Sequence, residues 1–205
     1  MKKGKNKKSF RRKGGNIFSE NYKICWSYLK ESKVFIFSIV GIFFAFAILG
    51  FFVSPPGDLY NQLMNYLKEI AGSVNGLSAG QLISFIFFNN ARISFFAMFL
   101  GIAAGIFPLL AAMFNGYVLG FVSKMSVNAD GFLVLWRLLP HGIFELPAVF
   151  ISMGIGVKLG FNLIGNREKF KDNLHSALRV FLFIVIPLLI IAAVIEGSLI
   201  YFFGD

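Results

Sequence analysis

The sequence predicts an all-α membrane protein, a polytopic helical bundle of about five transmembrane helices. Hydrophobic residues make up 57% of the chain and charged residues only 15%, and 27 residues are phenylalanine. Soluble domains carry about 45–50% apolar and about 25% charged residues. Much of this chain therefore has no water-facing side and belongs in a bilayer.

The N-terminal segment, residues 1–33, is expected to form a basic cytoplasmic arm that precedes a membrane domain of residues 34–205. Much of the net charge of +10 comes from lysines and arginines ahead of the first apolar run. Such an arm is typical of a topology determinant that binds anionic lipid head groups, and its placement argues against nucleic-acid binding. Residues 17–32 mix aromatic, apolar and basic residues, which indicates a short interfacial helix.

The first span is predicted at residues 34–53, which are long enough to cross the hydrocarbon core and are followed by Pro55 and Pro56. Residues 54–88 are expected to form a loop that rests on the membrane surface. The uncharged run 93–123 would reach about 46 Å as one helix, so it must turn.

The breakers in that run are Pro108 and Asn115-Gly116, which predict spans near 91–110 and 112–127. The next apolar stretch, 132–157, contains ionisable residues and prolines and is expected to be a broken or kinked fourth helix. The basic stretch 158–179 is expected to be a polar loop, followed by a final span at 180–201.

Both basic segments are expected in the cytoplasm of a multi-pass cell-membrane protein, with the C-terminus outside. We favour five spans over three spans with a re-entrant pair.

The most informative segment lies in the predicted fourth span, where Pro140 and Pro147 bracket His141 and Glu145. Residues at i and i+4 share a helix face, so this pair is compatible with a structural hydrogen bond, a proton or substrate pathway, or part of a metal site. Two ligands are too few for zinc, so no cofactor is predicted and a divalent metal at His141 and Glu145 is a minor alternative.

Other polar residues interrupt the apolar pattern and extend this candidate site. Asn89, Asn90 and Arg92 open the predicted second span, where an asparagine would suit a helix cap or join the His141–Glu145 pair. Asn115 lies inside the uncharged run, where Asn115-Gly116 indicates a turn.

Three glycine pairs have the small-xxx-small spacing that lets membrane helices approach closely. The pairs are Gly101 and Gly105, Gly116 and Gly120, and Gly156 and Gly160. They predict a tightly packed core of spans two to four, with the first and last helices outside it. A homo-oligomer built on such a face is an open alternative.

Together these motifs resemble the stage II sporulation protein M family of membrane proteins. The resemblance covers about residues 34–203 and rests on Phe88-Asn89-Asn90, Gly101 to Pro108, Asn115 to Gly120, Leu139 to Gly142, Glu145 to Ala148 and the glycines of 154–160. It implies about five helices and, from the family's namesake, a scaffold for envelope proteins. The sporulation role itself is not expected, because relatives occur in organisms that make no spores.

We therefore favour a non-enzymatic membrane scaffold or assembly factor with membrane-protein partners. The alternatives are a small transporter or flippase-like protein that uses His141 and Glu145, and, third, an intramembrane metal-dependent hydrolase. Catalysis is disfavoured because the sequence offers no evident nucleophile or activated water beside a base.

Overall fold

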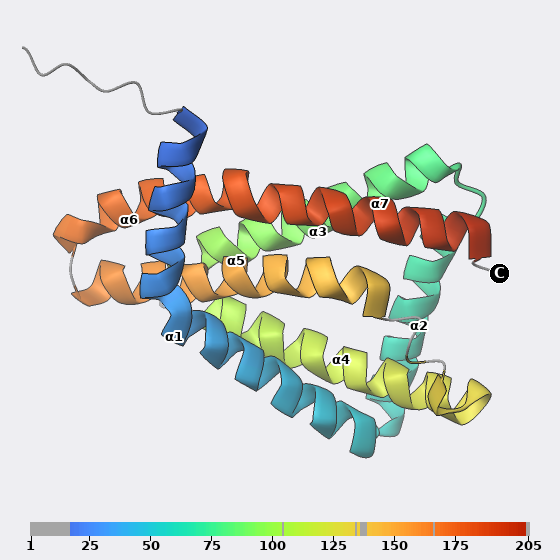
Figure 1. Ribbon diagram of the computed structural model, residues 1–205. Coiled ribbons are helices and arrows are strands. Elements are labelled where there is room, and N and C mark those ends of the chain that lie inside the picture. The colour runs from blue at the N-terminus through green and yellow to red at the C-terminus, as the bar shows by residue number, and fades with distance from the viewer. Residues whose placement is uncertain (1–16, 104, 134, 136–138, 166, 204–205) are drawn as a thin grey trace, which may run out of the picture.

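The structure is a computed structural model that is helical along most of the chain (Figure 1). It describes residues 17–103, 105–133, 135, 139–165 and 167–203. Within the helices, the side chains of residues 17–18, 71, 139–141 and 167–169 lie outside this description.

The described residues form α-helices and one short π-helical segment. In chain order they are α1 (Ile17–Phe52), α2 (Gly57–Val74), α3 (Ala79–Leu100), α4 (Ile106–Asp130), α5 (Leu139–Gly165), α6 (Arg167–Val180), η2 (Phe181–Val185) and α7 (Ile186–Phe203). Five helical stretches in these residues are long and apolar enough to cross a membrane. The predicted all-α bundle is confirmed, and five spans replace the three-span alternative.

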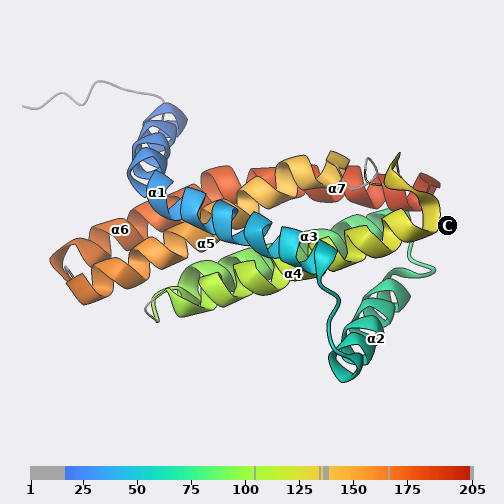
Figure 2. The ribbon, with the colours of Figure 1, turned by 90° about the horizontal axis from the view of Figure 1, so that it is seen from below.

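The spanning helices lie side by side, and their connections gather at two ends of the bundle (Figures 1 and 2). One end, called here the arm end, holds the start of α1 and the α3–α4 and α5–α6 connections. The opposite end, called the α2 end, holds α2, the α4–α5 connection and the C-terminus. The described part of the basic arm, residues 17–33, and the basic stretch 158–179 therefore lie toward the same end of the bundle, and residues 1–16 of the arm lie outside the described residues.

Helix α3 begins about twelve residues earlier than the predicted second span, so the expectation that residues 81–88 belong to a surface loop was wrong. A capping box starts the helix: the backbone N–H of Ser78 donates to Gln81 Oε1 at 2.9 Å, and the Ser78 side chain accepts from the N3 backbone. Asn89, Asn90 and Arg92 thus lie inside α3, and neither asparagine caps it.

The turn in the long uncharged run lies between Leu100 and Ile106. It precedes the predicted turn near residues 110–112 and both proposed breakers, Pro108 and Asn115-Gly116, and both of these lie inside α4. Gly105 precedes α4 with φ of 73°, a left-handed conformation that favours glycine. Pro108 is accommodated in the first turn of α4, where a missing N–H breaks no helical bond. Asn115 lies within α4 and its Nδ2 donates to the Ala111 carbonyl at 2.8 Å.

The predicted boundaries around the basic stretch 158–179 also change. Helix α5 continues to Gly165 and α6 begins at Arg167, so most of this stretch is helical and not a loop. The break in the fourth span lies ahead of Leu139, and α5 itself runs through Pro147. Likewise, the predicted interfacial segment 17–32 is continuous with the first span in α1.

Helices α6 and α7 join through the π-helical segment η2 into one long helix. Pro187 is the second residue after η2, and a proline cannot donate to the carbonyl four residues earlier, here that of Phe183 inside η2. Widening of the preceding turn to i→i+5 bonding accommodates such a loss.

Glycines allow the helix backbones to approach closely. Such close approaches involve the first and last spanning helices as well as spans two to four. A Cβ on Gly101 would strike the Gly156 backbone, and one on Gly105 would lie 3.2 Å from a Val157 methyl. On α4, a Cβ on Gly116 would strike the carbonyl of Phe43, and one on Gly120 that of Ala47.

These contacts join α3 to α5 and α1 to α4. Gly197 of α7 is equally close to Ile83 of α3, and Gly160 is buried in α5. The expectation that the first and last helices lie outside the packed core was therefore wrong. The close backbone approaches extend across the whole bundle.

Replacement of Gly120 by alanine is expected to destabilise the bundle, because the new methyl group meets the backbone of α1, which cannot rotate away. Overpacking of this kind costs about 1–3 kcal/mol. Gly41→Ala, on α1 with nothing within 4 Å of its Cβ, is the matched control. It should keep or raise stability by up to about 1 kcal/mol through helix propensity. Thermal unfolding of the purified variants in detergent measures the difference, and equal midpoints would contradict the contact.

Candidate functional site

The strongest candidate site lies between three helices in the half of the bundle nearer the α2 end. Glu145 of α5 is half-buried, and the Asn90 side chain of α3 lies close to its carboxylate. Glu196 of α7 is close enough for the two carboxylates to interact electrostatically. The structure thus brings Asn90 and Glu145 together, as one sequence alternative proposed, and adds Glu196, which the sequence had placed only near the end of a span.

Two features of α5 shape this site. Pro147 lies inside the helix and cannot donate to the Ile143 carbonyl, so a backbone oxygen near Glu145 lacks its helical donor. Ser152 Oγ donates to the Ala148 carbonyl at 3.0 Å in the following turn. Backbone oxygens and carboxylates together make this stretch rich in acceptors, which suits a proton or cation more than an anion.

His141 and Pro140 occupy the first turn of α5, but their side chains lie outside the described residues. The pairing of His141 with Glu145 therefore stays a prediction. Among the described side chains, no three His, Cys, Asp or Glu residues lie close enough together to hold a metal ion.

Of the other predicted polar residues, Arg92 and Asn115 are not part of this site, and Asn89 only borders it. Asn89, Arg92 and Asn115 are exposed on the outer surfaces of α3 and α4. Asn89 Nδ2 donates to Asn90 Oδ1 at 3.5 Å and so touches the site from outside. An arginine at the centre of a membrane helix costs roughly 2.5–3.5 kcal/mol on translocon scales, so the exposure of Arg92 needs an explanation.

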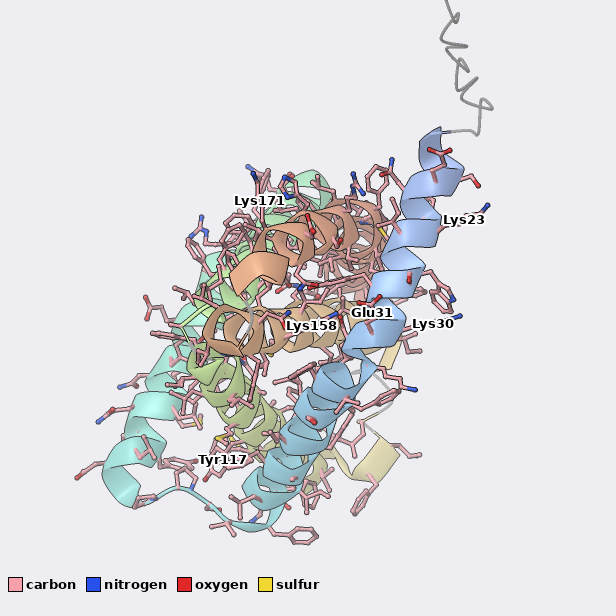
Figure 3. The ribbon with its side chains drawn as sticks, turned by 90° about the vertical axis from the view of Figure 1, so that its left-hand side faces the viewer. Lys23, Lys30, Glu31, Tyr117, Lys158 and Lys171 are labelled. Carbon is pink, nitrogen blue, oxygen red and sulfur yellow. The ribbon has the colours of Figure 1, made fainter. Side chains whose placement is uncertain are left out.

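A second polar cluster, which sequence reasoning missed, lies near the arm end (Figure 3). Lys158 of α5 is only 7% exposed, and its Nζ lies 3.5 Å from Glu31 Oε2 on α1. The same Nζ donates to Ser32 Oγ at 3.2 Å and lies 3.8 Å from the centre of the Tyr28 ring. An ion pair, a hydrogen bond and a cation–π contact, all made by Lys158, therefore hold α1 against α5 at this point.

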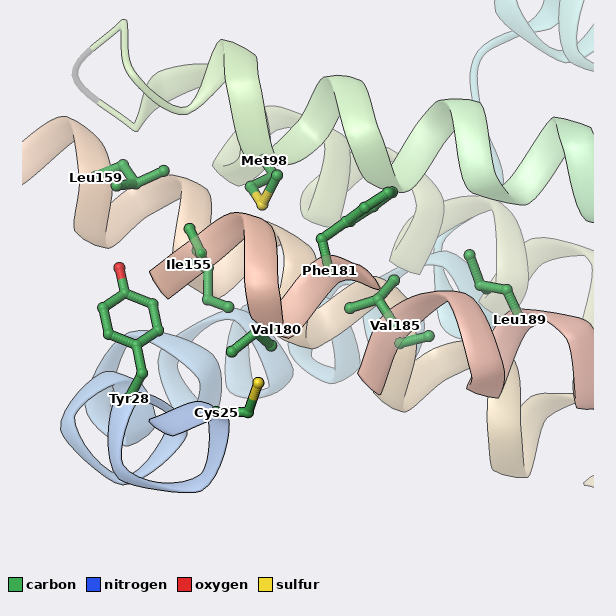
Figure 4. Packing of buried hydrophobic residues seen from close by; sticks show 11 residues of the cluster. Cys25, Tyr28, Met98, Ile155, Leu159, Val180, Phe181, Val185 and Leu189 are labelled. Carbon is green, nitrogen blue, oxygen red and sulfur yellow. The ribbon is translucent and has the colours of Figure 1, made fainter. Parts of the chain in front are cut away.

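The residues around this cluster form the largest apolar core of the bundle (Figure 4). Tyr28 reaches from α1 toward Ile155 and Leu159 of α5, and Cys25 packs beside Val180 of α6. Tyr28 Oη is buried with no hydrogen-bond partner among the described residues. The beginning of α1 is therefore anchored in the bundle by burial as well as by charge.

The sequence contained a pattern that places Lys158 inside the fourth helix. The residue is followed by Leu159, Gly160 and Phe161, so the apolar pattern of the fourth span continues beyond the lysine. The predicted fourth span ended at residue 157 because Lys158 was taken as its boundary, whereas α5 continues to Gly165. Glu31 was a visible partner, because it is one of two carboxylates, with Glu20, in a mostly basic arm.

Comparison with known proteins agrees with this arrangement of helices. The family model described as stage II sporulation protein M matches residues 35–199. The chain belongs to this family. The match covers most of each of the five spans and includes Asn90, Glu145, Glu196 and Lys158, but not the part of α1 that supplies Tyr28, Glu31 and Ser32.

Two relatives of this stage II sporulation protein M family member come from the archaeon Methanocaldococcus jannaschii. Uncharacterized protein MJ0706 is 29% identical over 82% of the chain and 78% of its own length. Uncharacterized protein MJ0793 is 30% identical over 53% of the chain and 65% of its own length. No solved structure matches the chain.

The two partners of the Lys158–Glu31 pair are expected to differ in their effect on stability. Glu31→Gln leaves a buried ammonium without a counter-charge, whereas Lys158→Met leaves a carboxylate whose side chain is 63% exposed to solvent. Glu31→Gln should therefore destabilise more, by about 1 kcal/mol, since the exposure of Glu31 reduces the value of the pair.

Thermal unfolding in detergent tests this asymmetry. Glu20→Gln, an exposed change on the same helix, is the control and should leave the midpoint unchanged. A larger loss for Lys158→Met than for Glu31→Gln would contradict the account.

Proposed function

We propose that this protein is a non-enzymatic membrane scaffold that holds other envelope proteins at the membrane. The observation that carries the proposal is α2, which extends from the bundle as a separate amphipathic helix. Figure 2 shows that it stands apart from the spanning helices at the α2 end. A helix that contributes so little to the bundle is available to a partner.

The contacts of α2 support this interpretation. Leu63 is its one described side chain that is buried, and the Tyr60 ring packs edge-on against Phe121 of α4 at 5.6 Å. Most other described side chains of α2 are exposed, including Tyr66 at 48% and Ile70 at 44%. Aromatic and apolar residues on such a surface are typical of interfaces with lipid or protein.

The beginning of α1 supplies a second surface at the arm end. Trp26 is 61% exposed there, and the Lys30 ammonium lies 5.7 Å from its ring. Lysine and tryptophan together suit the head-group region of a bilayer, so we place this end in the cytoplasm, against anionic lipids. The α2 end and the C-terminus then lie outside.

A photo-crosslinking residue at Tyr66 of the full-length protein in native membranes tests the scaffold. The expected result is a defined set of envelope proteins that is absent when the same residue replaces Leu133, which is 84% exposed near the same end. Lys68→Glu together with Ile70→Ser, on the exposed surface of α2, should reduce the yield severalfold and leave the bundle folded. Identical products from both positions, or none, would refute the proposal.

A second candidate is a small transporter, which the grouping of Glu145, Asn90 and Glu196 between three helices favours. Carboxylates between membrane helices are common in proton and ion pathways. The purified protein in liposomes with a pH gradient should then dissipate the gradient, and Glu145→Gln and His141→Ala should slow this at least tenfold. If the protein acts only as a scaffold, both variants should fold and keep their partners, and no flux should exceed that of empty liposomes.

A further inference from the structure

Arg92 is a charged residue on the outer face of a spanning helix, and its depth follows from the helix contacts. Gly101 packs on Gly156 and Gly105 on Val157, so the α3–α4 turn lies level with Lys158. Lys158 pairs there with the exposed carboxylate of Glu31, as expected at the edge of the hydrocarbon. Measured along the axis of α3, Arg92 lies about 14 Å from Gly101 at one end and about 21 Å from the Ser78 cap at the other end.

Arg92 has no partner within the chain that the structure describes. Its side chain is exposed and makes no ion pair or hydrogen bond with a described residue. Asn90, two positions earlier, faces Glu145, and two residues turn an α-helix by about 200°. Arg92 therefore points away from the carboxylates of the bundle interior.

Lipid alone is a poor environment for this residue. Arginines near helix ends snorkel to the interface, but Arg92 is in the middle of its span. Its neighbours on the same face are apolar: Phe88 is 64% exposed and Phe96 is 51% exposed, one turn to either side. An apolar face with one unneutralised cation fits a surface that contacts another helix carrying a negative charge.

Among the described residues, a second copy of the chain offers no exposed carboxylate at the depth of Arg92. The exposed carboxylates among the described residues lie at the ends of the bundle, and Glu145 and Glu196 are half-buried inside it. A twofold contact through the centre of this face would also bring two Arg92 side chains together. The complementary group must come from a different protein.

We propose that the outer face of α3, formed by Phe85, Phe88, Asn89, Arg92 and Phe96, binds a transmembrane helix of a partner protein that carries an aspartate or glutamate at mid-membrane depth. This deepens the scaffold function proposed above by naming the chemistry of one partner. The carboxylate pairs with the Arg92 guanidinium, and the phenylalanines pack against the apolar part of the partner helix. The site is separate from α2, so the scaffold has one contact within the bilayer and one at its surface.

The test uses purified full-length protein in phosphatidylcholine vesicles with a synthetic leucine-rich single-span helix as the probe. One probe carries a glutamate at its centre and the matched probe a leucine, and energy transfer measures the binding of each. The wild type should bind the glutamate helix about threefold to thirtyfold more tightly, the range found for polar contacts between membrane helices.

Variants at Arg92 assign this preference to the residue. Arg92→Leu should remove it, and Arg92→Glu should instead prefer a probe with a central lysine. Lys171→Leu, at an exposed position of α6, is the control and should keep the wild-type preference. Arg92→Leu removes a charge from an apolar surface, so it is expected to fold, which circular dichroism checks.

Three results would overturn the proposal: equal binding of both probes by the wild type, an unchanged preference in Arg92→Leu, or loss of the preference when anionic phosphatidylglycerol is added. The last would mean that lipid head groups neutralise Arg92. The probe experiment needs no native partner, so it is independent of crosslinking at α2. Loss of the α2 crosslinks with probe binding intact would refute the scaffold function and leave the α3 surface in place.

Discussion

The close approach of helix backbones at glycines is the constraint on which the rest of the structure depends. Helices in lipid gain no hydrophobic free energy from association, so packing and polar contacts hold them together. Gly120 against Ala47 fixes α1 on α4, and Gly101 against Gly156 fixes α3 on α5. These contacts fix the position of each helix along the axis of the bundle, and so they determine which polar residues of neighbouring helices come into contact.

As a result, the two polar clusters lie at different positions along the axis of the bundle. Near the arm end, Lys158 meets Glu31 where α1 crosses α5, and a carboxylate that reaches solvent makes the buried ammonium tolerable. Toward the α2 end, Asn90 meets Glu145 between α3 and α5. The first cluster has its charges balanced, whereas the second gathers carboxylates. The two clusters therefore differ in chemistry, one suited to fixing a helix and the other to holding a proton or cation.

The fold class and the number of spans could be predicted from the sequence because hydropathy over some twenty residues reports burial in lipid directly. The boundaries of the helices could not be predicted, for two reasons. Apolar residues continue through a turn, as at Gly101–Gly105, and a single charge occurs inside a helix, as at Lys158. Of the candidate site, Glu145 could be singled out from the sequence because it is a carboxylate inside an apolar stretch. Its contact with Asn90 was one of several alternatives, since periodicity within one helix does not say which residue of another helix lies opposite.

The α3–α4 turn has a consequence for how the protein enters the membrane. No charged residue lies between Arg92 and Lys124, so this helical hairpin has no lysine or arginine at its tip to hold it on one side. Its orientation during synthesis is then set by the charges on α1 before it and on the α5–α6 hairpin after it. The orientation of the middle of the protein is therefore expected to depend on the charges at its ends.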